Sequence, residues 1–113
     1  MTDTVVIALA RFRPDAERIA AFLHGEFREY HKEIFAECFP KAKRIVALMS
    51  AGIVVRSIAP LLSDKWNDPA VVVVTPNLAY AIPVLGGHHG ANALARELAG
   101  LGIVPVISTA TEA

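Results

Sequence analysis

The stretch AIPVLGGHHGANALARELAG (residues 81–100) contains the features that decide the fold. It begins as an apolar run typical of a strand, breaks into Gly-Gly-His-His-Gly, and continues with Leu94, Ala95 and Leu98 on one side of a predicted helix. A strand that leads into a helix is the repeating unit of α/β folds. Such a connection needs a glycine or two, so three glycines and two adjacent histidines indicate a backbone that something else approaches closely.

The whole chain alternates between strands and helices in the same way. Five segments are β-prone and bounded by turn residues, and are therefore predicted strands: 4–10, 43–49, 70–75, 79–85 and 103–109. Helices are predicted at 14–24, 27–39, 50–62 and 89–102, and a longer strand through Val55 is the alternative for the third. The sequence thus predicts an α/β fold: a layered open sheet, mainly parallel, with an antiparallel hairpin at 70–85 and helices on both faces.

Length and composition limit the possible classes of protein. The 113 residues suffice for a single domain, 1–113, with 54% hydrophobic residues and a net charge of zero. The basic residues are scattered, so we expect no nucleic-acid partner. No apolar run is long enough to span a bilayer, and Asp3 stands where a signal peptide carries positive charge, so we expect no membrane association and a cytoplasmic location. The single cysteine, Cys38, fits a reducing compartment.

Two loop–helix junctions are candidates for a ligand site. In open α/β sheets the ligand crevice lies beyond the carboxyl ends of the strands, so MSAGIVVR (49–56) and LGGHHGAN (85–92) are expected to lie there together. Both bring small residues to a helix start, where amide donors favour an anion. Neither junction matches a Walker loop or the dinucleotide fingerprint, so phosphate is allowed but not indicated, and carboxylates satisfy the same donors.

His88 and His89 are the candidate catalytic residues, because imidazole titrates near neutral pH and can act as acid or base. The alternative is that one of them caps the helix or bonds a neighbouring loop. The candidate substrate-binding residues are Ser50, Ala51, Gly52, Arg56, Gly86, Gly87, Gly90 and Asn92.

Several of these residues have alternative interpretations. Arg56 could hold a carboxylate through two hydrogen bonds, or could be a surface arginine paired with Asp64 or Glu112. Ser50 is most simply an N-cap, and Asn92 could cap the helix or reach a ligand. Trp66 could stack on a flat ligand, although a core anchor is the favoured interpretation. His24, His31 and Cys38 follow no ligand spacing, so no protein-bound metal is predicted.

The two junctions also carry a resemblance to a known family. ALMSAGIVVRSIAPLLSDKWNDPAVVVV (47–74), AIPVLGGHHGANALARELA (81–99) and PVISTATEA (105–113) resemble the N-terminal domain of the CbiG family, the cobalt-precorrin-5A hydrolases of anaerobic cobalamin biosynthesis. The resemblance runs from about residue 45 to the end, and its most specific motifs are AGIVVR (51–56) and GGHHGAN (86–92).

The resemblance implies an activity. The family opens the δ-lactone of a cobalt-bound, ring-contracted corrinoid precursor, which then loses a two-carbon fragment as acetaldehyde. That substrate is a macrocycle rimmed with carboxylates, and it brings the cobalt with it, so no cofactor held by the protein is expected. The alternative function is a non-catalytic tetrapyrrole- or polyanion-binding module, or a subunit of a multi-domain corrinoid enzyme.

The family pattern continues beyond this region. We therefore expect this chain to be either a separate N-terminal subunit or the N-terminal part of a longer protein. Its expected partners are a C-terminal CbiG domain or further copies of itself.

Overall fold

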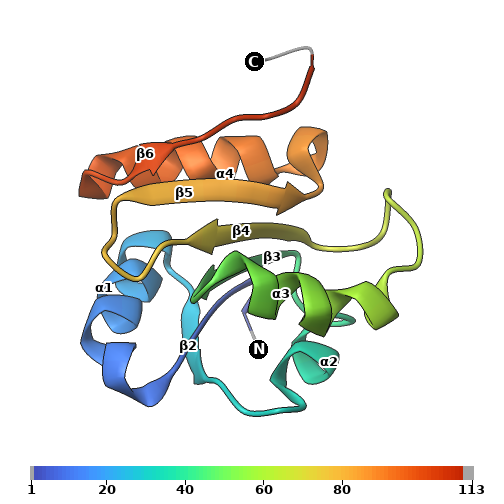
Figure 1. The fold of residues 1–113 in the computed structure, drawn as a ribbon, viewed down its shortest axis with the longest axis horizontal. Helices are drawn as coiled ribbons and strands as arrows, with labels where there is room; N and C mark the ends of the chain where they lie inside the picture. The colour runs from blue at the N-terminus through green and yellow to red at the C-terminus, as the bar shows by residue number, and fades with distance from the viewer. Residues whose placement is uncertain (1, 111–113) are drawn as a thin grey trace.

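In the computed structural model, which describes residues 2–110, one six-stranded sheet has the order β2-β1-β3-β4-β5-β6 (Figure 1). Strands β1 to β4 are parallel, β5 is antiparallel to β4, and β6 is parallel to β5. The strands are β1 Thr4–Ala8, β2 Glu26–Glu29, β3 Arg44–Leu48, β4 Ala70–Val74, β5 Tyr80–Leu85 and β6 Val104–Pro105. The helices are α1 Arg13–Leu23, α2 Ile34–Cys38, α3 Ala51–Ile58 and α4 Ala91–Glu97. The expected mainly parallel α/β sheet with a hairpin at 70–85 is confirmed.

Both faces of the sheet are covered, because successive side chains of each strand point to opposite sides. On one face, Val6, Val46 and Val72 pack with α1 and α4. On the other face, the alternate residues Ile7 and Ile45 pack with α2 and α3. Burial on both sides explains why β1 and β4 read as continuous apolar runs rather than as alternating ones.

The predicted helix at 27–39 is wrong in its first half. Residues Glu26–Glu29 form the edge strand β2, which pairs with β1 in parallel, with Val6 opposite Phe27. The helix is confined to Ile34–Cys38. The spacing of Tyr30, Ile34 and Cys38 suggested a continuous helix, but all three residues reach the same core cluster from a strand end and a short helix.

The segment at 50–62 is helical, so the alternative strand through Val55 is wrong. Helix α3 is followed by a 3-10 turn at Ala59–Leu61, where Pro60 lies in the first turn. The predicted helix at 89–102 is present as α4 and a 3-10 turn at Leu98–Leu101, and Gly102 ends it in a left-handed conformation. The last strand is shorter than expected, with only Val104–Pro105 paired.

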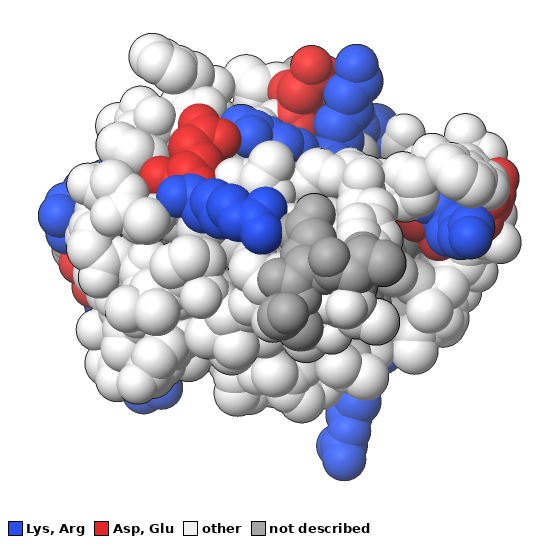
Figure 2. All heavy atoms as spheres, turned by 90° about the horizontal axis from the view of Figure 1, so that it is seen from above, with Lys and Arg blue, Asp and Glu red and all other residues white. Residues whose placement is uncertain are grey.

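Strand β6 forms one edge of the sheet, on the face shown in Figure 2. The amides of Val104 and Val106 donate inward to β5, and the residue between them is Pro105, which has no amide hydrogen to offer outward. In Figure 2 most of the charged side chains of this face lie in its upper part and at one side, and the area below them is mostly uncharged. Pro105 thus helps to protect the edge of the sheet against pairing with another strand.

Cys38 is completely buried on α2, and burial raises the pKa of its thiol above the ordinary value of 9.0. The folded state therefore keeps the thiol proton where the unfolded chain loses it. This pKa difference contributes stability that is complete below the unfolded pKa and is lost as the pH rises through the folded pKa.

We expect the free energy of unfolding to fall more steeply between about pH 8 and pH 10 in this protein than in Cys38→Ala, measured by urea denaturation. Parallel pH profiles for the two proteins would contradict this assignment.

Candidate functional site

The two junctions lie at opposite ends of the strands, measured along the strand direction, so the expectation of a shared crevice is wrong. Strand β3 ends at Leu48 beside Val74, the last residue of β4, and α3 begins there. Strand β5 begins at that same end, with Ala81 opposite Val74, and finishes at Leu85 opposite Val71. The two junctions are therefore separated by roughly 10 Å or more along the strands. Figure 1 shows α3 beginning at the left and the β5–α4 connection at the right.

The hairpin is the physical reason for this separation. The rule that ligand sites lie at the carboxyl ends of strands places junctions together only when the strands are parallel. Because β5 runs antiparallel to β4, its carboxyl end lies beside the amino ends of β1 to β4. The 86–92 turn, meaning residues 86 to 92 between β5 and the first residues of α4, thus forms a site of its own.

Glycines give the 86–92 turn its shape. Gly86 and Gly90 have positive φ angles of 72° and 112°, and they flank a single 3-10 turn, Gly87–His89. The amides of His89 and Ala91 both donate to the Gly86 carbonyl, at 2.9 and 3.0 Å. A side chain at either glycine would be strained. The turn therefore displays both histidines on a tightly folded backbone.

Gly90→Ala is expected to lower the free energy of unfolding by about 1–3 kcal/mol, because φ of 112° is a conformation that L side chains rarely adopt. The matched control is Gly52→Ala on α3, where an added Cβ meets nothing within 4 Å and φ is not positive. There we expect no loss, and a gain of up to about 1 kcal/mol from helix propensity. Urea denaturation of the two variants compares them, and equal stabilities would contradict the strained-turn assignment.

Asn92 connects the 86–92 turn to the segment that follows β6. Its side chain is only 2% exposed, and its amide nitrogen donates to Thr109 Oγ1 at 3.0 Å. A Cβ on Gly87 would lie 2.6 Å from Thr109 Cγ2, so the segment after β6 passes close over the turn. The structure thus places Asn92 where it fixes the turn against the last described residues.

His89 faces a pocket, and Trp66 forms another wall of it. The two rings lie edge to face, with their centroids 4.4 Å apart. The pocket has a volume of about 310 Å³. Its lining residues are Ala42, Lys43, Trp66, Asn67, Asp68, Pro69 and His89. His88 is exposed but is not among them, so His89 is the histidine that the structure brings to a cavity.

Trp66 is 67% exposed, so its favoured interpretation as a core anchor is wrong. The sequence signal that distinguishes the two possibilities is its polar neighbourhood, Ser-Asp-Lys-Trp-Asn-Asp. Sequence reasoning missed the pocket's cationic residue, Lys43, because it precedes β3 and so lies at the opposite end of that strand from the 49–56 junction. Its ammonium lies 4.0 Å from Asp3, and both side chains are highly exposed, so this ion pair is weak.

The start of α3, at the other end of the sheet, is open. Ser50 has the backbone conformation of an N-cap but makes no side-chain capping hydrogen bond, and Ala51 and Gly52 are exposed. Arg56 is also exposed, and among residues 2–110 it forms no ion pair, so the pairing with Asp64 is absent. Glu112, its other expected partner, lies outside the described residues.

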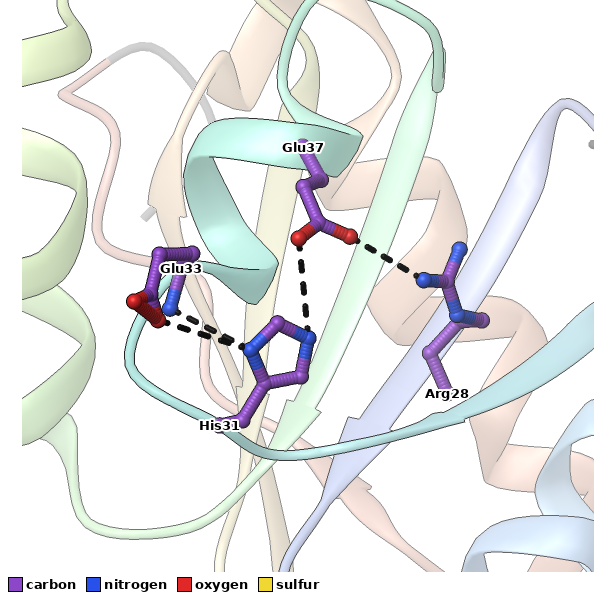
Figure 3. Close-up of polar contacts among 4 residues, drawn as sticks. All are labelled: Arg28, His31, Glu33 and Glu37. Atoms are coloured by element: carbon purple, nitrogen blue, oxygen red, sulfur yellow. Dashed lines mark hydrogen bonds and ion pairs between the residues drawn. The ribbon is translucent and has the colours of Figure 1, made fainter.

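A second histidine cluster lies at the connection from β2 to α2 (Figure 3). His31 is 3.6 Å from Glu33 and 3.7 Å from Glu37, and Glu37 also accepts a hydrogen bond from Arg28 at 3.2 Å. These side chains are all substantially exposed, and β2 is separated from β5 by three strands. Within residues 2–110 no group of three or more His, Cys, Asp or Glu side chains is arranged to hold a metal ion.

The molecule is thus an open α/β sheet domain with a pocket beside a glycine-rich strand–helix turn. Residues 33–112 match the family model described as "Cobalamin synthesis G N-terminal", and the chain belongs to this family. Among the described residues, no helix has both the length and the apolar character needed to cross a bilayer.

Similar proteins are known by sequence and by structure. The chain is 47% identical over 78 residues to the cobalt-precorrin-5A hydrolase of Salmonella typhimurium, an alignment that covers 67% of this chain and 22% of that protein. It is 39% identical over 108 residues to the cobalt-precorrin-5A hydrolase of Priestia megaterium, with 87% and 29% covered. A crystal structure of a cobalamin biosynthesis protein G homolog from Sulfolobus solfataricus superposes with a TM-score of 0.82 at 28% identity, covering 93% of this chain. The match spans 36% of that homolog, so this chain corresponds to a minor part of each relative.

Proposed function

We propose that this chain acts in cobalamin biosynthesis as the N-terminal part or subunit of a cobalt-precorrin-5A hydrolase, and that the pocket between Trp66 and His89 contacts the substrate. The observation that carries this proposal is the position of His89, which the 86–92 turn displays at the mouth of a pocket with a lysine in its wall. Membership of the family and the names of the relatives supply the reaction.

Lactone hydrolysis needs a base that takes a proton from water and a positive charge that stabilises the developing oxyanion. In the proposed step the His89 imidazole accepts a proton from water while the water oxygen bonds to the lactone carbonyl carbon. The ring C–O bond then breaks, giving a carboxylic acid, which loses its proton to solvent, and an alkoxide that takes back the proton held by His89. Lys43 lines the same pocket and supplies positive charge to the developing oxyanion or to a rim carboxylate. His88, on the same turn, remains the second candidate for proton transfer.

The predicted substrate contacts divide between the two ends of the sheet. Gly86, Gly87 and Gly90 belong to the proposed site because they let the backbone come close to a ligand. Ser50, Ala51, Gly52 and Arg56 remain predicted anion contacts, but they lie at the other end and cannot hold the same carboxylate as Lys43. Cobalt arrives within the substrate in this proposal, and the protein holds no cofactor.

A second function is favoured by one observation. A catalytic histidine is usually oriented by a hydrogen bond to another group. Among residues 2–110, the His89 imidazole has a ring contact with Trp66 but no hydrogen bond. A domain that binds the corrinoid while another domain completes the catalytic group fits this arrangement, and the relatives have the additional length for such a domain.

The test is acetaldehyde release from cobalt-precorrin-5A, measured with this protein alone and with the C-terminal portion of the Priestia megaterium relative. We expect release when both parts are present. Binding without release in either mixture would favour the binding module. Neither binding nor release would contradict both functions.

A further inference from the structure

We infer that Trp66 is a stacking platform for the flat conjugated ring of a carboxylate-bearing ligand. The inference rests on the proposed function for the location of the ligand, and it names the surface that recognises it. Trp66 is the only tryptophan of the chain, and it is the most exposed of the large apolar side chains in the described residues. A flat ligand that stacked on this indole would remove apolar area from water, which favours binding.

The loop that carries Trp66 is fixed before any ligand binds. The Trp66 amide donates to Asp64 Oδ1 at 3.0 Å, and the Asn67 side-chain amide donates to Asp64 Oδ2 at 2.6 Å. Asp68 closes the loop by accepting from the amides of Ser63 and Asp64, at 2.9 and 3.2 Å. A loop ordered by its own hydrogen bonds presents the ring with little further loss of entropy on binding.

Two lysines near the ring suit a flat, acidic ligand, and the carboxylate of Asp68 in the same pocket already accepts hydrogen bonds from two backbone amides. The Lys65 ammonium lies 5.1 Å from the Trp66 ring centroid, a weak cation–π contact at an exposed site. A planar ring can replace this ammonium on the indole face, while Lys65 and Lys43 pair with carboxylates at the ligand's rim. The His89 ring borders the indole on one side, with the two centroids 4.4 Å apart, so a ring stacked on Trp66 would lie close to the imidazole.

The pocket continues into an apolar recess. A neighbouring pocket of about 380 Å³ shares Ala42, Asn67 and Asp68 with the Trp66 pocket. Its other walls include Phe39, Pro40 and Leu61. The two pockets together offer an aromatic platform with cations beside it and apolar walls beyond it, which suits a macrocycle with both acidic and alkyl substituents.

Uroporphyrin III, a planar macrocycle with eight carboxylates, is the probe for this inference. Because Trp66 is the single tryptophan, we expect saturable quenching of the protein's tryptophan fluorescence by uroporphyrin III and none by citrate, which carries carboxylates without a ring. In absorbance titrations, Trp66→Ala is expected to bind at least about tenfold more weakly, or about 1.4 kcal/mol. Trp66→Phe keeps a ring and is expected to retain most of the affinity.

The matched control is Tyr80→Ala, which removes another exposed aromatic ring at the start of β5, the end far from the 86–92 turn. It is expected to leave uroporphyrin III affinity unchanged, and circular dichroism verifies the fold of each variant. Equal affinity in Trp66→Ala and the unmodified protein would overturn the inference. If that variant also fails to assemble with the C-terminal portion of the relative, Trp66 is a contact between protein parts and not a platform for a ligand.

The outcomes for the inference and for the proposed function differ. Acetaldehyde release with an unchanged KM in Trp66→Ala would reject the platform and leave the hydrolase proposal standing. Binding of uroporphyrin III that depends on Trp66, in a protein that never supports acetaldehyde release, would retain the platform and reject the hydrolase. If both are correct, Trp66→Ala raises KM by about tenfold or more and changes kcat less.

Discussion

Replacing His89 with alanine is expected to lower the rate of acetaldehyde release by about 10²–10⁴-fold, the usual contribution of a positioned general base. The loss follows from removing the imidazole that faces the Trp66 pocket. Substrate affinity is expected to change far less than the rate, because the pocket walls remain. The measurement is steady-state kinetics of acetaldehyde release with the C-terminal portion of a relative present.

Two further histidine variants complete this experiment. His24→Asn is the matched control, because His24 ends α1 in a left-handed conformation that asparagine tolerates, and its rate is expected to be unchanged. His88→Ala is expected to lose less activity than His89→Ala, because His88 does not line the pocket. A larger loss in His88→Ala, or full activity in His89→Ala, would reject His89 as the base.

Leu94→Ala is expected to lower the free energy of unfolding by about 2–5 kcal/mol, the cost of a cavity at a buried leucine. Leu94 is fully buried on α4 and packs in the cluster that contains Val72 and Val74 of β4. The same helix follows the 86–92 turn, so its packing also fixes the site. Urea denaturation monitored by circular dichroism measures the change.

Leu62→Ala provides the comparison for this variant. Leu62 is 50% exposed in the loop after α3, so its truncation leaves little cavity and is expected to cost about 0.5 kcal/mol or less. Similar losses in the two variants would show that α4 does not pack on the sheet as described.

Much of the fold could be predicted from local patterns. The β-branched runs at β1, β3 and β4 and the periodicity of α4 reflect burial that each segment experiences independently of chain order. Strand β2 could not be recognised in this way, because Glu26–Glu29 has no strong apolar pattern and is fixed by its pairing with β1. Edge strands depend on a partner strand, which local spacing does not reveal.

The candidate site was predicted in part. The glycines and histidines of the 86–92 turn indicated a special backbone, and the structure shows positive φ angles at Gly86 and Gly90. The location of the turn relative to α3 depends on the direction of β5, and the hairpin at 70–85 already contained that information. Trp66 and Lys43 could not be assigned to the site, because they come from separate loops that meet only when β3, β4 and β5 lie side by side.

The most direct measurement is a nuclear magnetic resonance titration of the ¹⁵N-labelled protein with uroporphyrin III. If the ligand binds at the Trp66–His89 pocket, the indole resonance of Trp66 and the amide resonances of Gly86, Gly87 and Gly90 shift together, while those of residues 50–56 stay in place. Shifts centred on residues 50–56, with the Trp66 indole unmoved, would contradict it and place the ligand at the opposite end of the sheet.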